Sequence, residues 1–97
     1  MKKLTKENSR IELEKHALHI IMTNKNVFKL KDILEELRND CDESITNDEV
    51  FEVAINGLDF CLNTGRVDIY GEFTYMVDPI EQIKYVSQNE ANVGVSV

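Results

Sequence analysis

The chain has little of several features that mark particular classes of protein. No apolar run approaches the roughly 20 residues of a membrane-spanning helix, so we expect no membrane association. The basic N-terminus MKKLTKENSR has no apolar stretch behind it, which argues against a secretory signal and favours a cytoplasmic location. The two cysteines, Cys41 and Cys61, form no C-x-x-C motif. In the cytoplasm we expect both to be reduced, one buried and one in a loop.

Sequence signatures of catalysis and of cofactor binding are also lacking. There is no Gly-rich phosphate loop, and no Cys–His or Ser–His–Asp spacing indicates an activated nucleophile. Glu12, His16 and His19 share one side of a predicted helix and are the residue types that bind Zn²⁺, but no fourth ligand is visible. We therefore interpret the two histidines as solvent-facing. We expect no metal, no cofactor and no enzymatic activity.

What is present fits one small globular domain. Of the 97 residues, 42% are apolar and 30% are charged, both ordinary for a globular protein. A chain of this length buries roughly 60–70% of its unfolded surface, enough for one modest core. We assign the folded domain to residues 9–87, with a basic flexible arm at 1–8 and a flexible tail at 88–97.

Charge is divided unevenly along the chain. The formal net charge is −7, but residues 1–31 carry eight bases and three acids, a net +5. Residues 32–97 carry three bases and fifteen acids, a net −12. Most of the surface therefore repels a phosphate backbone, and only the N-terminal arm and the first predicted helix are suited to meet a polyanion.

The most informative stretch is TNDEVFEVAINGLDFCLNTG, residues 46–65. Thr46 and Glu49 form a T-x-x-E capping box, and Gly65 suits the left-handed position just past a helix end. Spacings of three and four predict one buried stripe, made of Phe51, Ala54, Ile55, Leu58, Cys61 and Leu62. The opposite face has four acids and no base, and consists of Asp48, Glu49, Glu52, Asn56, Asp59 and Asn63.

Two further helices and a short strand precede this stretch. Asn8 or Ser9 caps a first helix that runs to about Thr23. Residues 27–29 are rich in β-formers and predict a very short strand. A second helix is expected at about 30–39, with its leucines and Ile33 facing inward.

After Gly65 the apolar period changes from 3.6 to 2. Residues 66–70 and 73–77 predict two strands, and Gly71-Glu72 predicts a two-residue type II′ turn between them. Asp78 and Pro79 then suit the start of a short last helix.

This order of elements resembles the winged helix-turn-helix superfamily from about Ser9 to Val77. The resemblance rests on residues 27–39, 46–64 and the hairpin as the wing, and on a helix-to-wing junction read as LNTGRV. The layout is also similar to the N-terminal domain of the RNA polymerase delta subunit, an acidic winged-helix module, and to small phage transcription factors. We expect an α+β, mostly helical winged helix; the alternative is a four-helix cluster with an appended hairpin.

The resemblance implies DNA binding, with the third helix in the major groove. Reading bases requires Arg, Lys, Asn or Gln on the exposed face, with basic residues nearby for phosphates. Here that face offers Asn56 and Asn63 among four carboxylates. Our leading hypothesis is therefore a non-enzymatic module that binds a protein partner with a basic surface, in transcription regulation or its inhibition. The partner surface would be the acidic helix face, the wing, or both.

Two alternatives stay open at this point. A DNA-binding regulator, acting as a homodimer, would bind DNA weakly through the arm and the first helix, with a further base in the wing. The bases are Lys2, Lys3, Lys6, Arg10 and, in the wing, Arg66. An acidic inhibitor would instead act as a DNA mimic and present its carboxylates to a basic nucleic-acid channel, as some phage-encoded proteins do.

Aromatic side chains in the hairpin are a second candidate for the partner surface. With a two-residue turn, Tyr70 pairs with Phe73 and Asp68 pairs with Tyr75, so the three aromatics share one sheet face. If that face is the outer one, they form the kind of patch that marks interfaces. The alternative is that they pack beneath the last predicted helix.

Overall fold

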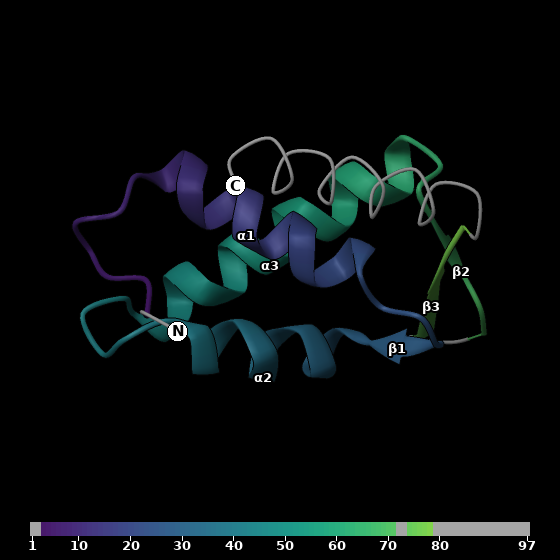
Figure 1. Cartoon of the computed structure of the whole chain (residues 1–97). Helices are drawn as coiled ribbons and strands as arrows, with labels where there is room; N and C mark the ends of the chain where they lie inside the picture. Colours follow the sequence, from purple (N-terminus) through teal and green to yellow (C-terminus); the bar gives the residue numbers. More distant parts are fainter. Residues whose placement is uncertain (1–2, 72–73, 79–97) are drawn as a thin grey trace, which may run out of the picture.

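The computed structural model describes residues 3–71 and 74–78, which form three helices and a small antiparallel sheet (Figure 1). The elements are α1 Arg10–Met22, β1 Phe28–Lys29, α2 Leu30–Asp40, α3 Asn47–Asn63, β2 Val67–Ile69 and β3 Thr74–Val77. The α+β class, the short strand before α2 and the hairpin after α3 are confirmed. The helix expected after Asp78 and the expected tail lie outside the described residues.

Local side-chain and backbone hydrogen bonds explain where α3 begins and ends. Thr46 Oγ1 accepts from the Glu49 N–H at 3.1 Å, and Glu49 Oε1 accepts from the Thr46 N–H at 3.4 Å. This is the expected capping box. At the other end, Gly65 has φ +73°, and Arg66 N–H donates to the Cys61 carbonyl at 2.9 Å. The helix therefore stops in a Schellman turn, which needs the left-handed conformation that glycine adopts without strain.

The sheet has three strands in the order β1-β3-β2, so the hairpin is not an isolated pair. β1 joins it by pairing Phe28 with Tyr75 and Lys29 with Thr74. The Phe28 and Tyr75 rings lie 5.7 Å apart between centroids, a distance typical of favourable aromatic pairs. The segment between α1 and α2 is thereby fixed to β3, the second strand of the hairpin.

The register of the hairpin differs by one residue from our expectation. Asp68 pairs with Met76 and Ile69 pairs with Tyr75. Tyr70 N–H donates to the Thr74 carbonyl at 2.9 Å, so three residues, and not two, lie between the last paired positions of the hairpin. The predicted two-residue turn is therefore wrong. A one-residue slip moves every side chain of one strand to the other face.

The core lies between the three helices and one face of the sheet, and α1 and α3 contribute most of its residues. The buried residues of α3 are Val50, Val53, Ala54, Gly57, Leu58 and Cys61. The predicted stripe is therefore partly wrong, because Phe51 is 51% exposed and Ile55 and Leu62 are only half-buried. One residue corresponds to a rotation of roughly 100° about the helix axis. The observed buried face of α3 is rotated from the expected one by less than this angle.

Gly57 gives the physical reason for this rotation. A Cβ added there would lie 3.3 Å from Ile21 Cδ1 and 3.7 Å from Ala17 Cβ. The missing side chain lets α1 approach the Gly57 side of α3 closely. That side is therefore buried, and Phe51, on another side of the helix, is left at the surface.

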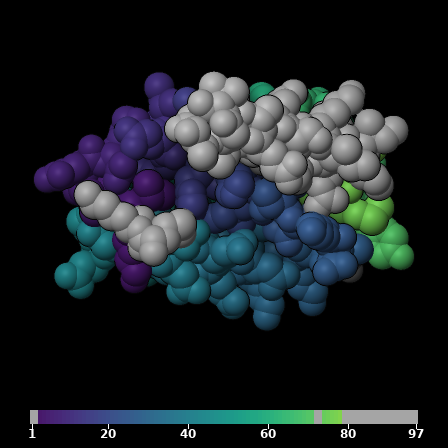
Figure 2. Space-filling view, in the orientation of Figure 1, coloured from purple at the N-terminus to yellow at the C-terminus, as the bar shows by residue number. Residues whose placement is uncertain are grey.

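The N-terminal segment that we expected to be a flexible arm is in part attached to the domain. Leu4 N–H donates to the Asp40 carbonyl, and Asp42 N–H donates to the Leu4 carbonyl, both at 2.8 Å. Leu4 also packs against the core. Figure 2 shows this segment, in purple, beside the teal residues that follow α2. Leu4 therefore attaches the N-terminal segment to the end of α2.

Candidate functional site

The exposed face of α3 is the most distinctive surface of the described chain. Its exposed side chains are Asn47, Asp48, Phe51, Glu52, Asn56, Asp59, Phe60 and Asn63. No Lys, Arg or His occurs anywhere in the helix. Five of the six residues we assigned to this face are exposed. Glu49 is half-buried, because its carboxylate is engaged in the cap.

Two phenylalanines that sequence reasoning did not place on this surface lie at its edges. Phe51 is 51% exposed and Phe60 is 48% exposed. They are nine positions apart, about two and a half helical turns, so they project from opposite sides of α3. The acidic residues Asp48, Glu52 and Asp59 lie between them. The aromatics were missed because the spacing placed Phe51 in the core and gave no reason to single out Phe60.

The edge of α3 beside α2 contains an apolar groove. It has a volume of about 470 Å³ and is lined by Leu34, Glu35, Arg38, Asn47, Asp48, Val50 and Phe51. Val50 is buried and Leu34 half-buried, while Glu35 and Asp48 are exposed. The groove therefore combines an apolar floor with carboxylates at its rim.

The edge beside α1 contains a smaller hollow of about 340 Å³, lined by Glu14, Leu18, Asn56, Gly57 and Phe60. The Arg66 guanidinium lies 5.4 Å from the centroid of the Phe60 ring, a cation–π geometry. In this contact Arg66, one of the bases that we assigned to DNA binding, covers part of the Phe60 ring.

One of the exposed acidic residues of α3 has a basic partner that the sequence did not suggest. Glu52 has no base one turn away on α3, but Arg10 of α1 reaches it with an Nη2–Oε1 distance of 2.9 Å. Arg10 also contacts Glu14 at 3.4 Å. Asp48 and Asp59 make no ion pair within residues 3–71 and 74–78. The hydrogen bonds from Thr46 hold the pKa of Glu49 below its usual value. Glu49 therefore stays ionised in its cap.

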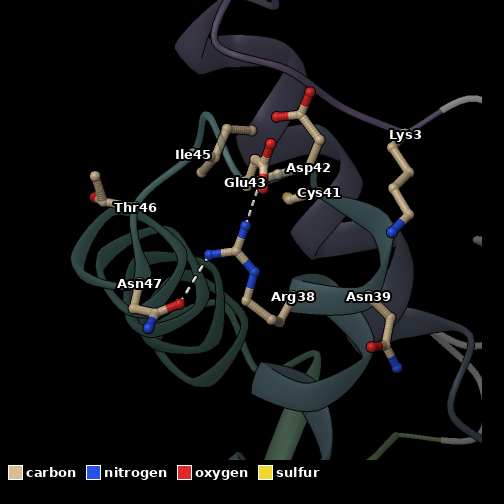
Figure 3. A pocket seen from close by; sticks show the side chains of 9 residues that line it. All are labelled: Lys3, Arg38, Asn39, Cys41, Asp42, Glu43, Ile45, Thr46 and Asn47. Atoms are coloured by element: carbon tan, nitrogen blue, oxygen red, sulfur yellow. Dashed lines mark hydrogen bonds between the residues drawn. The ribbon is translucent and has the colours of Figure 1, made fainter.

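A polar hollow of about 690 Å³ lies beside the loop between α2 and α3, and its lining residues are drawn in Figure 3. The Arg38 guanidinium crosses it, donating to Asn47 Oδ1 at 2.8 Å and to the Asp42 carbonyl. Asp42 in turn accepts from the Ser44 hydroxyl and from Ser44 N–H, which lowers the pKa of its carboxyl. These polar groups form hydrogen bonds with one another. We therefore interpret them as stabilising the loop that precedes α3, and not as a binding site.

The bases proposed for DNA binding are not gathered on one surface. Lys3 and Lys6 lie near the loop that precedes α3, and Lys6 N–H donates to Ser44 Oγ at 2.9 Å. Arg10 is paired with acids, and Arg66 lies past the other end of α3. A 17-residue helix separates these ends by about 25 Å. Lys2 lies outside the described residues.

The hairpin aromatics do not form the expected patch. Tyr75 is half-buried against Phe28, whereas Tyr70 is 60% exposed. Tyr70 lies opposite Thr74, so Tyr70 and Tyr75 are on different faces of the sheet. Phe73 lies outside the described residues. The register shift therefore removes the argument for a shared aromatic face.

Of the two histidines expected to face solvent, His19 is exposed but His16 is not. His16 Nε2 lies 2.7 Å from Asp40 Oδ2 and is half-buried, so it links α1 to the end of α2. Its ring stacks near His19, with centroids 6.4 Å apart. Within the described part of the chain, no three His, Cys, Asp or Glu side chains are grouped to hold a metal ion. Both cysteines are free and buried; Cys41 follows the end of α2, as expected of a loop thiol, but is buried there.

Comparison of the chain with protein-family models, with curated proteins and with solved structures gave no match. None of the helices in residues 3–71 and 74–78 is long and apolar enough to cross a membrane.

Proposed function

We propose that this chain is a non-enzymatic module of the winged-helix type that binds a protein partner with a basic surface, in transcription regulation or its inhibition. The order of the elements supports the fold type, because β1 precedes α2 and the hairpin directly follows α3. The partner surface is the exposed face of α3.

The observation that carries this proposal is the combination of Phe51 and Phe60 with three exposed carboxylates on one helix without a base. Aromatic residues are enriched at the centres of protein interfaces, where they supply most of the binding free energy. The carboxylates that lie between the two phenylalanines attract a basic partner and raise its association rate. The same carboxylates oppose a phosphate backbone, so the face is better suited to protein than to DNA.

A DNA-binding regulator is the second candidate, favoured by the exposed Lys3 and Lys6 and by the exposed Asn56 and Asn63 on α3. In this case the bases of the N-terminal segment would contact phosphates, and duplex binding would be weak at physiological salt. The acidic DNA mimic is a variant of the leading proposal in which the basic surface is a nucleic-acid channel.

The test is affinity capture from a lysate of the source cells with mass spectrometry, run beside a duplex-DNA shift assay. We expect one protein to be retained and then released by added salt. We expect only a weak shift of DNA, abolished when Lys2, Lys3 and Lys6 are replaced by Ala; these substitutions keep Leu4, which packs on the core. Tight, sequence-specific DNA binding that survives them but is lost in Asn56→Ala would favour the DNA regulator.

A further inference from the structure

The groove between α2 and α3 differs from the rest of the α3 face in having an apolar wall open to solvent. Phe51 leaves half of its surface exposed above buried Val50 and half-buried Leu34. No aromatic ring or guanidinium of the described residues stacks on the Phe51 ring. Phe60, by contrast, already carries the Arg66 guanidinium. Of the two edges of α3, the Phe51 edge therefore has the larger gain from being covered.

The charges around the groove restrict what would cover it. Glu35 and Asp48 are exposed at its rim, one on each helix. The single base in the lining, Arg38, donates to Asn47 Oδ1 and to the Asp42 carbonyl, so two of its nitrogens are bonded to the first residue of α3 and to the loop before it. A segment that fits must therefore offer apolar surface to the floor and positive charge to both rims.

The size of the groove restricts the occupant further. Its volume of about 470 Å³ is within the roughly 300–1,000 Å³ of sites that enclose small ligands. A groove of this size holds one or two side chains, and the rest of the occupant lies along the rim. Binding of this kind follows the mode in which an amphipathic segment places its anchors in an apolar groove.

From these features we propose that the α2–α3 groove binds a large apolar side chain of a protein segment that carries Lys or Arg on both sides of it. This inference rests on the proposed function and names the chemistry of the partner. Phe51 contacts the apolar anchor, and Glu35 and Asp48 face the flanking basic side chains.

The experiment uses a random peptide library displayed on phage and selected against the full chain. We expect enriched peptides to share one large aliphatic or aromatic residue flanked by Lys or Arg. Peptides made from these sequences should bind at least tenfold more weakly to Phe51→Ala. The matched control is Phe60→Ala, which removes an equally exposed phenylalanine from the same helix and should change affinity less than threefold.

Neutralising the rim tests the charge requirement separately. Glu35→Gln with Asp48→Asn keeps the side-chain shapes, and we expect it to weaken the peptides and to reduce the salt dependence of binding. Enriched peptides without the basic and apolar pattern, or an equal loss in Phe60→Ala, would overturn the inference. The inference would also be overturned if the chain bound random duplex DNA more tightly than the peptides and lost that binding in Phe51→Ala. Fluorescence anisotropy measures both affinities.

Failure here is distinguishable from failure of the proposed function. If the captured partner still depends on Glu52 and Asp59 but not on Phe51, the groove inference is wrong while partner binding by α3 stands. If no protein depends on either group, the proposed function itself is wrong.

Discussion

Arg10 of α1 binds Glu52 of α3 across the helix interface, with 2.9 Å between Nη2 and Oε1. Both side chains are largely exposed, at 41% and 63%, so the pair is screened by solvent. Its main consequence is for the α3 face, where it offsets one of three exposed carboxylates. Asp48 and Asp59 keep their charges without an ionic partner in the described part of the chain.

The stability contributed by this pair should be small. In a double-mutant cycle with Arg10→Ala and Glu52→Ala, we expect a coupling free energy of about 0–1 kcal/mol, as for exposed ion pairs in general. Urea unfolding of the four proteins measures it, and 1 M NaCl should remove it. A coupling that persists in high salt would show that the contact is buried rather than exposed.

Truncating Leu58 and Phe51 tests the orientation of α3. Leu58 is 3% exposed, so Leu58→Ala should lower the free energy of unfolding by about 2–5 kcal/mol. Phe51 is half exposed, and Phe51→Ala should cost about 1 kcal/mol or less, as at most surface positions. Chemical denaturation of both variants provides the comparison. Equal losses would mean that the helix is rotated as the sequence first suggested.

The features that sequence analysis predicted correctly depend on neighbouring residues. Thr46 and Glu49 satisfy each other's amides within one turn, and Gly65 ends the helix through its own backbone conformation. The strand at Phe28 was predicted from residues of high β-propensity directly before the start of the second helix. Such signals depend only on neighbouring residues, so they can be interpreted without knowledge of the tertiary packing.

The features that were missed depend on contacts between distant segments. The apolar positions of α3 allow two overlapping stripes, and the approach of Ile21 to Gly57 decides between them. The pairing of Arg10 with Glu52 joins residues that no local pattern relates. Two- and three-residue loops both suit Gly71, so the hairpin register, and with it the face of Tyr75, could not be derived from the turn alone.

Burial of Cys61 should make its thiol unreactive and should make stability fall at high pH. Burial raises the pKa of Cys61 to about 11. Between the unfolded and the folded pKa, the folded thiol therefore keeps its proton, whereas the unfolded thiol, with a pKa of about 8.5, loses it. Stability from this group is complete below the unfolded pKa and is lost as pH rises toward 11. Thiol titration with DTNB at pH 8 should be slow in buffer and fast in urea.

The control for that effect is Cys61→Ala, whose stability should depend less on pH between 9 and 11. Rapid labelling of the folded parent at Cys61 would contradict the burial. Cys41 is also buried, and its pKa is raised for the same reason, so mass spectrometry should assign the labelled residue.

The cap at the start of α3 should make stability depend on acid pH. The hydrogen bonds from Thr46 lower the pKa of Glu49, so the ionised carboxylate stabilises the fold above the unfolded pKa. That contribution is lost as pH falls through the lowered, folded pKa. Thermal unfolding between pH 7 and pH 2 should show a smaller decrease in Glu49→Gln than in the parent. An unchanged acid profile would contradict the role assigned to this carboxylate.

Loss of the capping hydroxyl itself should be measurable at neutral pH. Thr46→Ala leaves the Glu49 N–H without its side-chain acceptor, and N-cap truncations typically cost about 0.5–2 kcal/mol. Thr46→Ser, which retains the hydroxyl, is the matched control and should remain close to the parent in urea unfolding.

The most direct test of the central claim is the rate at which the captured partner associates with charge-reversed protein. Glu52→Lys with Asp59→Lys changes the net charge by the same amount as the control, Glu7→Lys with Asp68→Lys, which alters exposed acids away from α3. Circular dichroism establishes that both variants are folded. We expect association with the α3 variant to slow at least tenfold, with a weaker salt dependence, and the control to resemble the parent. Equal association rates for parent and α3 variant would contradict the proposal that the acidic face of α3 binds a basic protein surface.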